Sequence, residues 1–253
     1  MNTFKNKTAI VTGAGQGIGL EICKQLAVQG VNVILNDIEL SLAEEGARSI
    51  QKEKGNCIPV VGDCSDVAFI QTLIDTAVSN FGSVDIVIAN AGITLFGDFL
   101  EYKPEDFYQV MNLNLGGSFF LAQRAARQMK EQGTGGRILF MSSVTGHQAH
   151  KNLAAYSMSK AALEMLAKNL VLELSPYKIT VNAIAPGATS TERTKSDPDY
   201  EKTWARITPI GKPASIQDIA STALFLVSAE AGHITGQTLI VDGGWTSVSP
   251  SPY

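Results

Sequence analysis

The stretch Thr12-Gly13-Ala14-Gly15-Gln16-Gly17-Ile18-Gly19 decides the fold of this chain. It joins an apolar run of strand length, residues 8–11, to a helical pattern over residues 20–28. Glycines permit a tight turn and a close approach of backbone N–H groups to a phosphate, and the following helix adds the positive end of its dipole. The spacing Gly-x-x-x-Gly-x-Gly departs from the plain Gly-x-Gly-x-x-Gly fingerprint, which requires glycine where Ile18 stands. We therefore predict a dinucleotide site at Gly13, Gln16, Gly17, Ile18 and Gly19.

Short apolar runs alternate with longer helical patterns along the whole chain. Helical patterns begin near Gly17, Leu40, Asp66, Pro104, Leu153 and Ser215, and the strand-like runs cover residues 8–11, 31–35, 58–61, 84–89, 137–141, 180–185 and 238–241. Such alternation with right-handed crossovers predicts a parallel sheet covered by helices on both faces. We expect an α/β fold with a Rossmann-type doubly wound parallel sheet of about seven strands. Because no linker-like tract divides the chain, residues 1–253 are expected to form a single domain.

The composition argues against several classes of protein. The 253 residues are 45% hydrophobic and 17% charged, and the net charge is −4. No cluster of Lys and Arg indicates nucleic-acid binding, and no run of about 18 apolar residues indicates a membrane span. The three cysteines, Cys23, Cys57 and Cys64, lack metal-ligand spacing, so no metal site is expected. These features favour a cytoplasmic protein.

Asp37 closes the second strand pattern, eighteen residues after Gly19. A carboxylate at this place can accept hydrogen bonds from the adenosine ribose hydroxyls and repels a 2′-phosphate. The alternative is that Asp37 caps the next helix, but Ser41-Leu42-Ala43-Glu44 matches a capping box just downstream. Since no Arg or Lys adjoins Asp37, we expect NAD(H) in preference to NADP(H).

Tyr156 and Lys160 stand four residues apart, and Ser143 lies thirteen residues before Tyr156. In a helix, residues i and i+4 share a face, so the Lys160 ammonium can lie beside the Tyr156 phenol. A neighbouring cation stabilises the phenolate, which makes the tyrosine an acid/base group usable near neutral pH. Taken alone, the spacing fits an ordinary amphipathic helix turn better, and its interpretation depends on the other motifs.

Taken together, these motifs resemble the short-chain dehydrogenase/reductase family over essentially the whole chain. The matching positions are Thr12-Gly13-x-x-x-Gly17-x-Gly19, Asp63, Asn90-Ala91-Gly92, Asn114, Ser143, Tyr156-x-x-x-Lys160, Pro186-Gly187, Ile234-Thr235-Gly236-Gln237 and Val241-Asp242-Gly243-Gly244. The resemblance implies an enzyme that interconverts a secondary alcohol, or a sugar hydroxyl, and a carbonyl by hydride transfer with a nicotinamide cofactor.

The resemblance also implies a role for each matching residue. Tyr156 would exchange a proton with the substrate oxygen, and Ser143 would hydrogen-bond that oxygen. Lys160 would stabilise the phenolate and hold the nicotinamide ribose, and Asn114 would bind a water that links Lys160 to solvent. The remaining implied cofactor contacts are Asp63 at the adenine, Asn90, Ala91 and Gly92 along the adenosine, and Pro186, Gly187, Thr189 and Thr191 towards the nicotinamide carboxamide.

Three of these assignments have structural alternatives. Asp63 could instead cap the helix that starts near Asp66, and Gly92 could simply permit a turn. Ser142 precedes Ser143, and alternation at a strand end sends the two side chains to opposite sides. Ser143 is preferred because it matches the family spacing.

The substrate is expected at a loop of about residues 187–213, which shows no clear periodicity. Glu192 and Arg193 in that loop either bind sugar hydroxyls or are solvated charges. A polar wall is expected between Ser143 and Tyr156, unless its residues are an ordinary surface loop; it consists of His147, Gln148, His150 and Asn152. The loop resembles that of aldose dehydrogenases in the family. The alternatives are a 3-oxoacyl thioester (acyl carrier protein) reductase and a non-catalytic nucleotide-binding sensor or scaffold.

Two predicted helices, over residues 104–129 and 153–174, are apolar on more than one stripe. A helix that covers a sheet normally leaves one face in water, so these helices predict either subunit contacts or a deeper core within the chain. The family resemblance implies a homotetramer. Trp245 and the tail Ser249-Pro250-Ser251-Pro252-Tyr253 are hypothesised to reach the site of a neighbouring subunit.

Overall fold

Seven parallel strands form one sheet in the computed structural model, which describes residues 4–249. Their order across the sheet is β3-β2-β1-β4-β5-β6-β9. The order reverses between β1 and β4, which is the switch point where doubly wound folds bind ligands. The expected Rossmann-type sheet is confirmed. The strands are β1 (Thr8–Val11), β2 (Asn32–Asp37), β3 (Cys57–Val61), β4 (Ile86–Ala89), β5 (Gly136–Met141), β6 (Ile179–Pro186) and β9 (Thr238–Val241).

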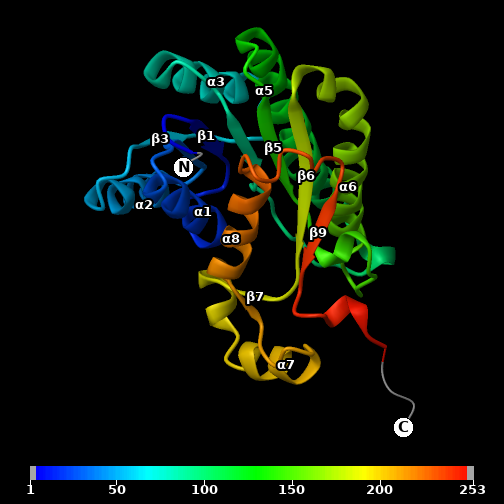
Figure 1. Ribbon diagram of the computed structural model, residues 1–253. Helices are drawn as coiled ribbons and strands as arrows, with labels where there is room; N and C mark the ends of the chain where they lie inside the picture. Colours follow the sequence, from blue (N-terminus) through cyan, green and yellow to red (C-terminus); the bar gives the residue numbers. More distant parts are fainter. Residues whose placement is uncertain (1–3, 250–253) are drawn as a thin grey trace.

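Helices cover both faces of the sheet (Figure 1). One face packs against α1 (Gly17–Val28), α2 (Leu40–Lys52) and α8 (Ile216–Val227), and the other against α3 (Val67–Phe81), α5 (Ser118–Gln132) and α6 (Ala154–Leu174). Alternate residues of one strand enter opposite cores: Ala9 and Val11 pack with the first set of helices and Ile10 with the second. Both halves of the core therefore depend on the central strands.

Some strand limits differ from those expected. The run 84–89 becomes a strand only from Ile86, because both backbone groups of Val84 bond to the Gln132 side chain. At the other end of the sheet, β2 extends to Asp37 and β6 to Pro186, which brings both residues to the edge where the strands end.

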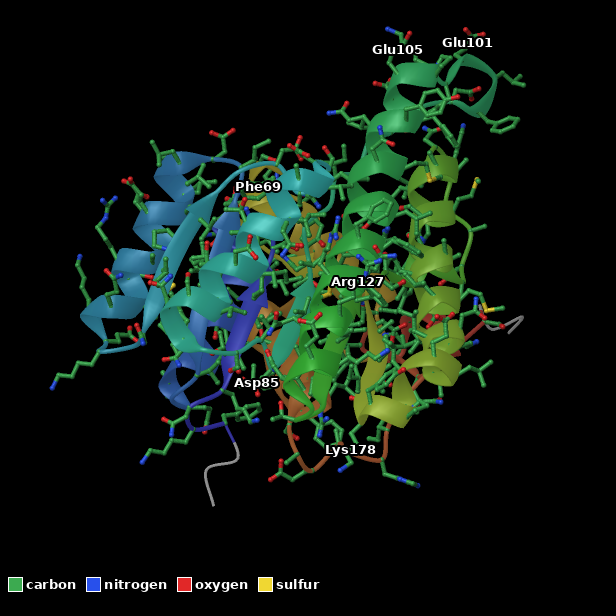
Figure 2. The ribbon with its side chains drawn as sticks, turned by 90° about the horizontal axis from the view of Figure 1, so that it is seen from above. Phe69, Asp85, Glu101, Glu105, Arg127 and Lys178 are labelled. Atoms are coloured by element: carbon green, nitrogen blue, oxygen red, sulfur yellow. The ribbon has the colours of Figure 1, made fainter. Side chains whose placement is uncertain are left out.

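The helix expected over residues 104–129 is divided. It runs as α4 (Pro104–Val110), a π-helical segment called η2 (Met111–Gly117), and α5. A π-helical turn holds an extra residue and changes the direction of the side chains within it. Figure 2 shows α4, marked by Glu105, projecting beyond the rest of the molecule together with the preceding short helix η1 (Phe99–Glu101). It also shows α5, which carries Arg127, beside α6.

The segment expected as an irregular loop contains short elements. Two-residue strands β7 (Thr189–Ser190) and β8 (Ala214–Ser215) pair with each other, and η5 (Glu192–Ser196) and α7 (Tyr200–Ile207) lie between them. In Figure 1 this segment lies beyond the carboxyl ends of β6 and β9. The rings of Trp204 in α7 and Trp245 in η6 (Trp245–Ser247) pack edge to face, with 4.9 Å between their centroids. Over residues 4–249, no helix has both the length and the apolar character needed to cross a membrane.

Candidate active site

A cavity of about 430 Å³ opens where the strands end, at the switch point of the sheet. Every residue predicted to bind the cofactor lines this cavity, from the glycine loop to Thr191. Of the four predicted catalytic residues, Ser143, Tyr156 and Lys160 also line it, and Asn114 does not. The structure thus brings positions from across the chain into one site.

The glycine loop fits a dinucleotide pyrophosphate. Gly13 and Gly17 have positive φ angles of 58° and 59°, which glycine adopts without strain. A Cβ on Gly13 would lie 2.7 Å from Ala91 Cα, and one on Gly19 would lie 2.6 Å from Asn90 Nδ2. The N-cap residue of α1, Gln16, makes no side-chain capping bond, so the first N–H groups of the helix remain available to an anion.

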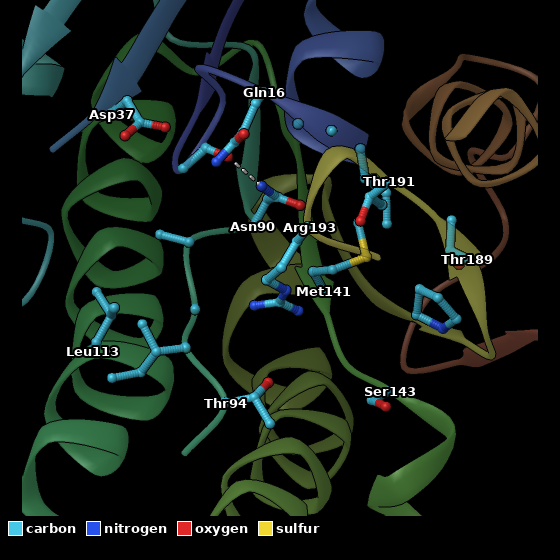
Figure 3. Close-up of a pocket in the computed structure, with 18 of the residues that line it drawn as sticks. Gln16, Asp37, Asn90, Thr94, Leu113, Met141, Ser143, Thr189, Thr191 and Arg193 are labelled. Atoms are coloured by element: carbon cyan, nitrogen blue, oxygen red, sulfur yellow. Dashed lines mark hydrogen bonds between the residues drawn. The ribbon is translucent and has the colours of Figure 1, made fainter. Parts of the chain in front are cut away.

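Asp37 is 9% exposed and stands between the glycine loop and α2. Its Oδ2 accepts a hydrogen bond from the N–H of Gly15 (2.8 Å), and its Oδ1 accepts one from the N–H of Glu39 (3.1 Å). The capping box expected at Ser41 is wrong: α2 begins at Leu40 with Glu39 at the N-cap, so Ser41 already lies inside the first turn. Asp37 is not the N-cap either, and its carboxylate borders the cavity (Figure 3).

The loop after β3 contains Asp63, whose Oδ1 accepts a hydrogen bond from the N–H of Ser65 (2.8 Å). The alternative role for Asp63 as an N-cap is wrong, because Asp66 is the N-cap of α3 and bonds to the N–H of Ala68. Sequence reasoning missed Asn36, whose Nδ2 donates to the carbonyls of Val60 (3.0 Å) and Gly62 (3.1 Å). The sequence feature that could have indicated this role is a polar asparagine within an otherwise apolar, buried strand.

Asn90 fastens the end of β4 to the glycine loop. Its Nδ2 donates to the carbonyls of Thr12 (2.9 Å) and Gly13 (2.8 Å), and the Thr12 hydroxyl accepts the N–H groups of Asn90 and Ala91. A Cβ on Gly92 would lie 3.2 Å from Asn114 Oδ1, so the absence of a side chain there permits close packing. The three residues line the cavity beside the glycine loop.

Tyr156 and Lys160 share a face of α6, as the spacing predicts. The Lys160 ammonium lies 5.5 Å from the centroid of the Tyr156 ring and donates a 2.7 Å hydrogen bond to the Met141 carbonyl. Only 4% of Lys160 is exposed, and this burial lowers its pKa below the usual lysine value. The charge of Tyr156 acts in the opposite direction, and that of Arg193 lowers the pKa further.

The structure separates the two serines at the end of β5. The hydroxyl of Ser142 is buried and has two acceptors on α6 for its single hydrogen, Glu164 Oε1 at 2.7 Å and the carbonyl of Lys160 at 3.1 Å. Ser143 lines the cavity, and its Oγ accepts only a longer bond of 3.3 Å from the N–H of Thr145. Ser142 is thus bonded to α6, while the Ser143 hydroxyl hydrogen has no acceptor among residues 4–249.

Asn114 lies in the π-helical segment and is completely buried. Its Oδ1 accepts the N–H of Ile93 (2.8 Å), and its Nδ2 donates to the Ile93 carbonyl (3.0 Å) and to Ser159 Oγ (3.2 Å). The side-chain amide of Asn114 is thus occupied by protein groups at both ends, and the expected water that links Asn114 and Lys160 to solvent stays a prediction. The side chain holds Ile93, which lies in the loop after β4.

The expected polar wall does not line the cavity. The Nδ1 atom of His147 lies 3.3 Å from Glu164 Oε1. The ring centroids of His150 and Trp245 are 5.1 Å apart, and the Asn152 carbonyl accepts the N–H of Gly97. None of the four residues is among those that line the cavity. Lining residues that were missed include Ile93, Thr94, Leu113, Met141 and Tyr200, whose proximity depends on tertiary packing rather than on any sequence pattern. Within residues 4–249 no group of three or more His, Cys, Asp or Glu could hold a metal ion.

Known proteins resemble this chain over nearly its whole length. A family model described as enoyl-(acyl carrier protein) reductase matches residues 13–246. The L-rhamnose 1-dehydrogenase (NAD(P)(+)) of Azotobacter vinelandii is 38% identical over 247 residues, covering 94% of this chain and 96% of that protein. The 2-dehydro-3-deoxy-D-gluconate 5-dehydrogenase of Dickeya dadantii is 34% identical over 251 residues, covering 97% and 98%.

Solved structures show the same architecture. The gluconate 5-dehydrogenase of Burkholderia cenocepacia, solved in complex with NADP and tartrate, superposes with a TM-score of 0.91 at 32% identity, covering 98% of this chain and 99% of that chain. The protein is therefore a nicotinamide-dependent oxidoreductase that acts on CH–OH groups. Within that class, the chain belongs to the short-chain dehydrogenase/reductase family.

Proposed function

We propose that this protein is a sugar dehydrogenase that prefers NAD(H) and interconverts a hydroxyl and a carbonyl of a polyhydroxy substrate. The observation that carries this proposal is the position of Tyr156 and Lys160 in the same cavity as the glycine loop. Relatives named for rhamnose, gluconate and 2-dehydro-3-deoxy-gluconate support a sugar substrate. They include both neutral sugars and sugar acids.

Each reactive residue has a chemical task in this proposal. A nicotinamide cofactor bound in the cavity would supply the hydride acceptor or donor. Tyr156 exchanges a proton with the substrate oxygen, and Ser143 donates its free hydroxyl hydrogen to that oxygen while charge develops on it. Lys160 stabilises the Tyr156 phenolate through its nearby positive charge and binds the nicotinamide ribose. Asn114 fixes Ile93 at the cavity edge, and it would bind the water that links Lys160 to solvent.

The remaining contacts hold the cofactor along the cavity. Gly13, Gln16, Gly17, Ile18 and Gly19 bind the pyrophosphate through the open end of α1. Asp63 and the segment 90–92 contact the adenosine, and Pro186, Gly187, Thr189 and Thr191 contact the nicotinamide side; all of them line the same cavity.

Asp37 supports the preference for NAD(H). Its buried carboxylate lies at the cavity edge, and the next residue along the chain, Ile38, supplies no positive charge for a 2′-phosphate. The two relatives with named cofactors do not decide the matter, because one is named for NAD(P)(+) and the other was solved with NADP. The proposed preference therefore rests on the residues of this chain and not on those relatives.

A homotetramer is supported by apolar side chains that the chain itself leaves uncovered. On α5 and α6, Phe119 is 41% exposed, Met165 58% and Leu172 83%, so a deeper core within the chain does not account for them. Leu239 and Ile240 of the edge strand β9 are also exposed.

Trp245 packs against Trp204 and His150 of its own chain, and tail residues 250–253 lie outside the described residues. The single-domain organisation and the cytoplasmic location stay predictions.

The test of the proposed function is a panel assay that follows the absorbance of reduced nicotinamide. Neutral aldoses, polyols, aldonates, hydroxysteroids and 3-oxoacyl thioesters are each offered with NAD(H) and with NADP(H). We expect turnover of a sugar or sugar acid with NAD(H). Reduction of thioesters alone would favour the acyl-thioester reductase. Cofactor binding without turnover of any compound would favour a nucleotide-binding sensor.

A further inference from the structure

Arg193 places a positive charge inside the cavity. It belongs to η5, the short helix that follows Thr191, and it lines the cavity together with Tyr156 and Lys160. Figure 3 shows its side chain projecting into the cavity on the side of Met141 and Thr94. The guanidinium therefore lies within reach of a molecule bound at the reactive end.

This guanidinium has no counter-charge in the part of the chain that the structure describes. None of the ion pairs among residues 4–249 includes Arg193, and no hydrogen bond involves its side chain. The adjacent carboxylate, Glu192, points elsewhere: its Oε2 lies 3.5 Å from where a Cβ of Gly17 would stand, at the glycine loop. The Arg193 guanidinium thus lines the cavity with no protein partner among the described residues.

Lys160 is a second cation in the cavity, and its charge favours the binding of an anion there. Burial lowers the pKa of Lys160, Tyr156 raises it, and the repulsion between Lys160 and the nearby Arg193 lowers it by a smaller amount than either. A carboxylate placed against Arg193 would form two parallel charge-assisted hydrogen bonds and would offset this repulsion. A neutral sugar hydroxyl would leave the positive charge of Arg193 uncompensated.

The position of Arg193 favours a substrate group over the cofactor pyrophosphate. The pyrophosphate already has a binding place in the N–H groups of the glycine loop and the start of α1. The electrostatic neighbours of Arg193 are Lys160 and Tyr200, at the reactive end of the cavity. Its charge therefore acts where the substrate is expected.

We propose that Arg193 binds the carboxylate of the substrate, and that the substrate is a polyhydroxy acid rather than a neutral aldose. This inference rests on the proposed sugar dehydrogenase function and defines its substrate class. Arg193 is then the residue that determines specificity, since it distinguishes an acid from its neutral analogue.

The test compares an aldonate with its neutral amide, for example D-gluconate with D-gluconamide, and extends to other aldonates and their amides. Wild-type protein, Arg193→Gln, Arg193→Lys and the control Lys195→Gln are assayed with each pair. Lys195 is an exposed cation of the same short helix that does not line the cavity. The affinity for NADH is measured separately by its fluorescence.

We expect wild-type protein to prefer the acid, and Arg193→Gln to raise KM for the acid about 10- to 100-fold, as the loss of a charged hydrogen bond implies. The amide should be affected little, Arg193→Lys should retain part of the preference, and Lys195→Gln should retain all of it. NADH affinity should stay unchanged in every variant.

Three results would overturn the inference while leaving the proposed function standing. They are a wild-type preference for the neutral compound, an equal loss for acid and amide in Arg193→Gln, and a loss of NADH affinity with unchanged discrimination. The last result would assign Arg193 to the cofactor pyrophosphate. Turnover of neither acids nor neutral sugars would overturn both proposals.

Discussion

Asp37 uses its two carboxylate oxygens to accept hydrogen bonds from the backbone of Gly15 and Glu39. These bonds fix the carboxylate against the glycine loop before any ligand binds. A negative charge held in place at 9% exposure repels a phosphate more strongly than a mobile surface carboxylate would. The same residue therefore shapes the loop, and in the proposed function it also selects the cofactor.

We predict that Asp37→Ala shifts the ratio of kcat/KM for NAD to that for NADP by about 10-fold or more towards NADP, because the repulsion of the 2′-phosphate disappears. Asp37→Asn is the matched variant, since it removes the charge and keeps an oxygen acceptor for the loop. Steady-state kinetics with both cofactors check this expectation. Unchanged selectivity in both variants would remove Asp37 from cofactor selection.

Sequence patterns predicted the position of a site residue where the pattern lies within a single helix or strand. Tyr156 and Lys160 are neighbours on one helix turn, and Asp37 stands at the end of one strand. Asn114 was recognised by motif, but its bonds to Ile93 connect segments 21 residues apart. Local patterns contain no information about such a contact, so the occupied amide could not be foreseen.

At the scale of single elements, the capping-box pattern at Ser215 forms a helix cap and the same pattern at Ser41 does not. Ser215 caps α8: its hydroxyl accepts the N–H of Asp218, and Asp218 accepts the N–H and the hydroxyl of Ser215. Ser41 matches the same pattern at α2 but lies inside the first turn, because that helix begins at Leu40. The pattern predicts a helix start only to within a residue or two.

We predict that Ser215→Ala lowers the free energy of unfolding by about 1 kcal/mol, as loss of an N-cap usually does. Ser41→Ala is the control and should change it by no more than a few tenths of a kcal/mol. Chemical denaturation of both variants at pH 7 measures the difference. An equal effect at the two positions would contradict the assigned cap.

The effect of Ser215→Ala should also depend on pH. The hydrogen bonds from Ser215 lower the pKa of Asp218 below the usual carboxyl value. A group with a depressed pKa in the folded state stabilises the protein above its unfolded-state pKa and loses this contribution as pH falls. The difference between wild type and Ser215→Ala should therefore be largest near neutral pH and should shrink as the pH falls below about 4. Denaturation curves across this range check the sign, and a difference that grows in acid would contradict it.

At the scale of the whole molecule, the alternation of apolar runs and helical patterns was sufficient to predict the sheet. Every expected strand is present, and the order of the strands places their carboxyl ends around one cavity. The segment 187–213 was predicted less well, because its elements are short and depend on contacts such as that between Trp204 and Trp245. The π-helical segment was missed because helix periodicity does not reveal an inserted residue.

The apolar surface of α5 and α6 leads to a prediction about assembly. Wild-type protein should be a homotetramer, and the double variant Phe119→Glu with Met165→Glu should form smaller species, because the new charges would be buried at the interface. Val28→Glu is the control, since Val28 is 71% exposed on α1, which covers the other face of the sheet. Size-exclusion chromatography with light scattering gives the masses. A wild-type monomer, or a double variant of unchanged mass, would contradict the proposed interface.

The central claim is that Tyr156 is the acid/base group of a dehydrogenase site, and Tyr156→Phe tests it most directly. The measurement is kcat on the best sugar substrate from the panel assay, together with the dissociation constant for NADH. Tyr108→Phe serves as the control, since Tyr108 is an exposed tyrosine outside the cavity. We predict that kcat of Tyr156→Phe falls by about 10²- to 10⁴-fold while NADH affinity stays within about threefold of wild type. Turnover close to that of wild type, with NADH still bound, would contradict the account.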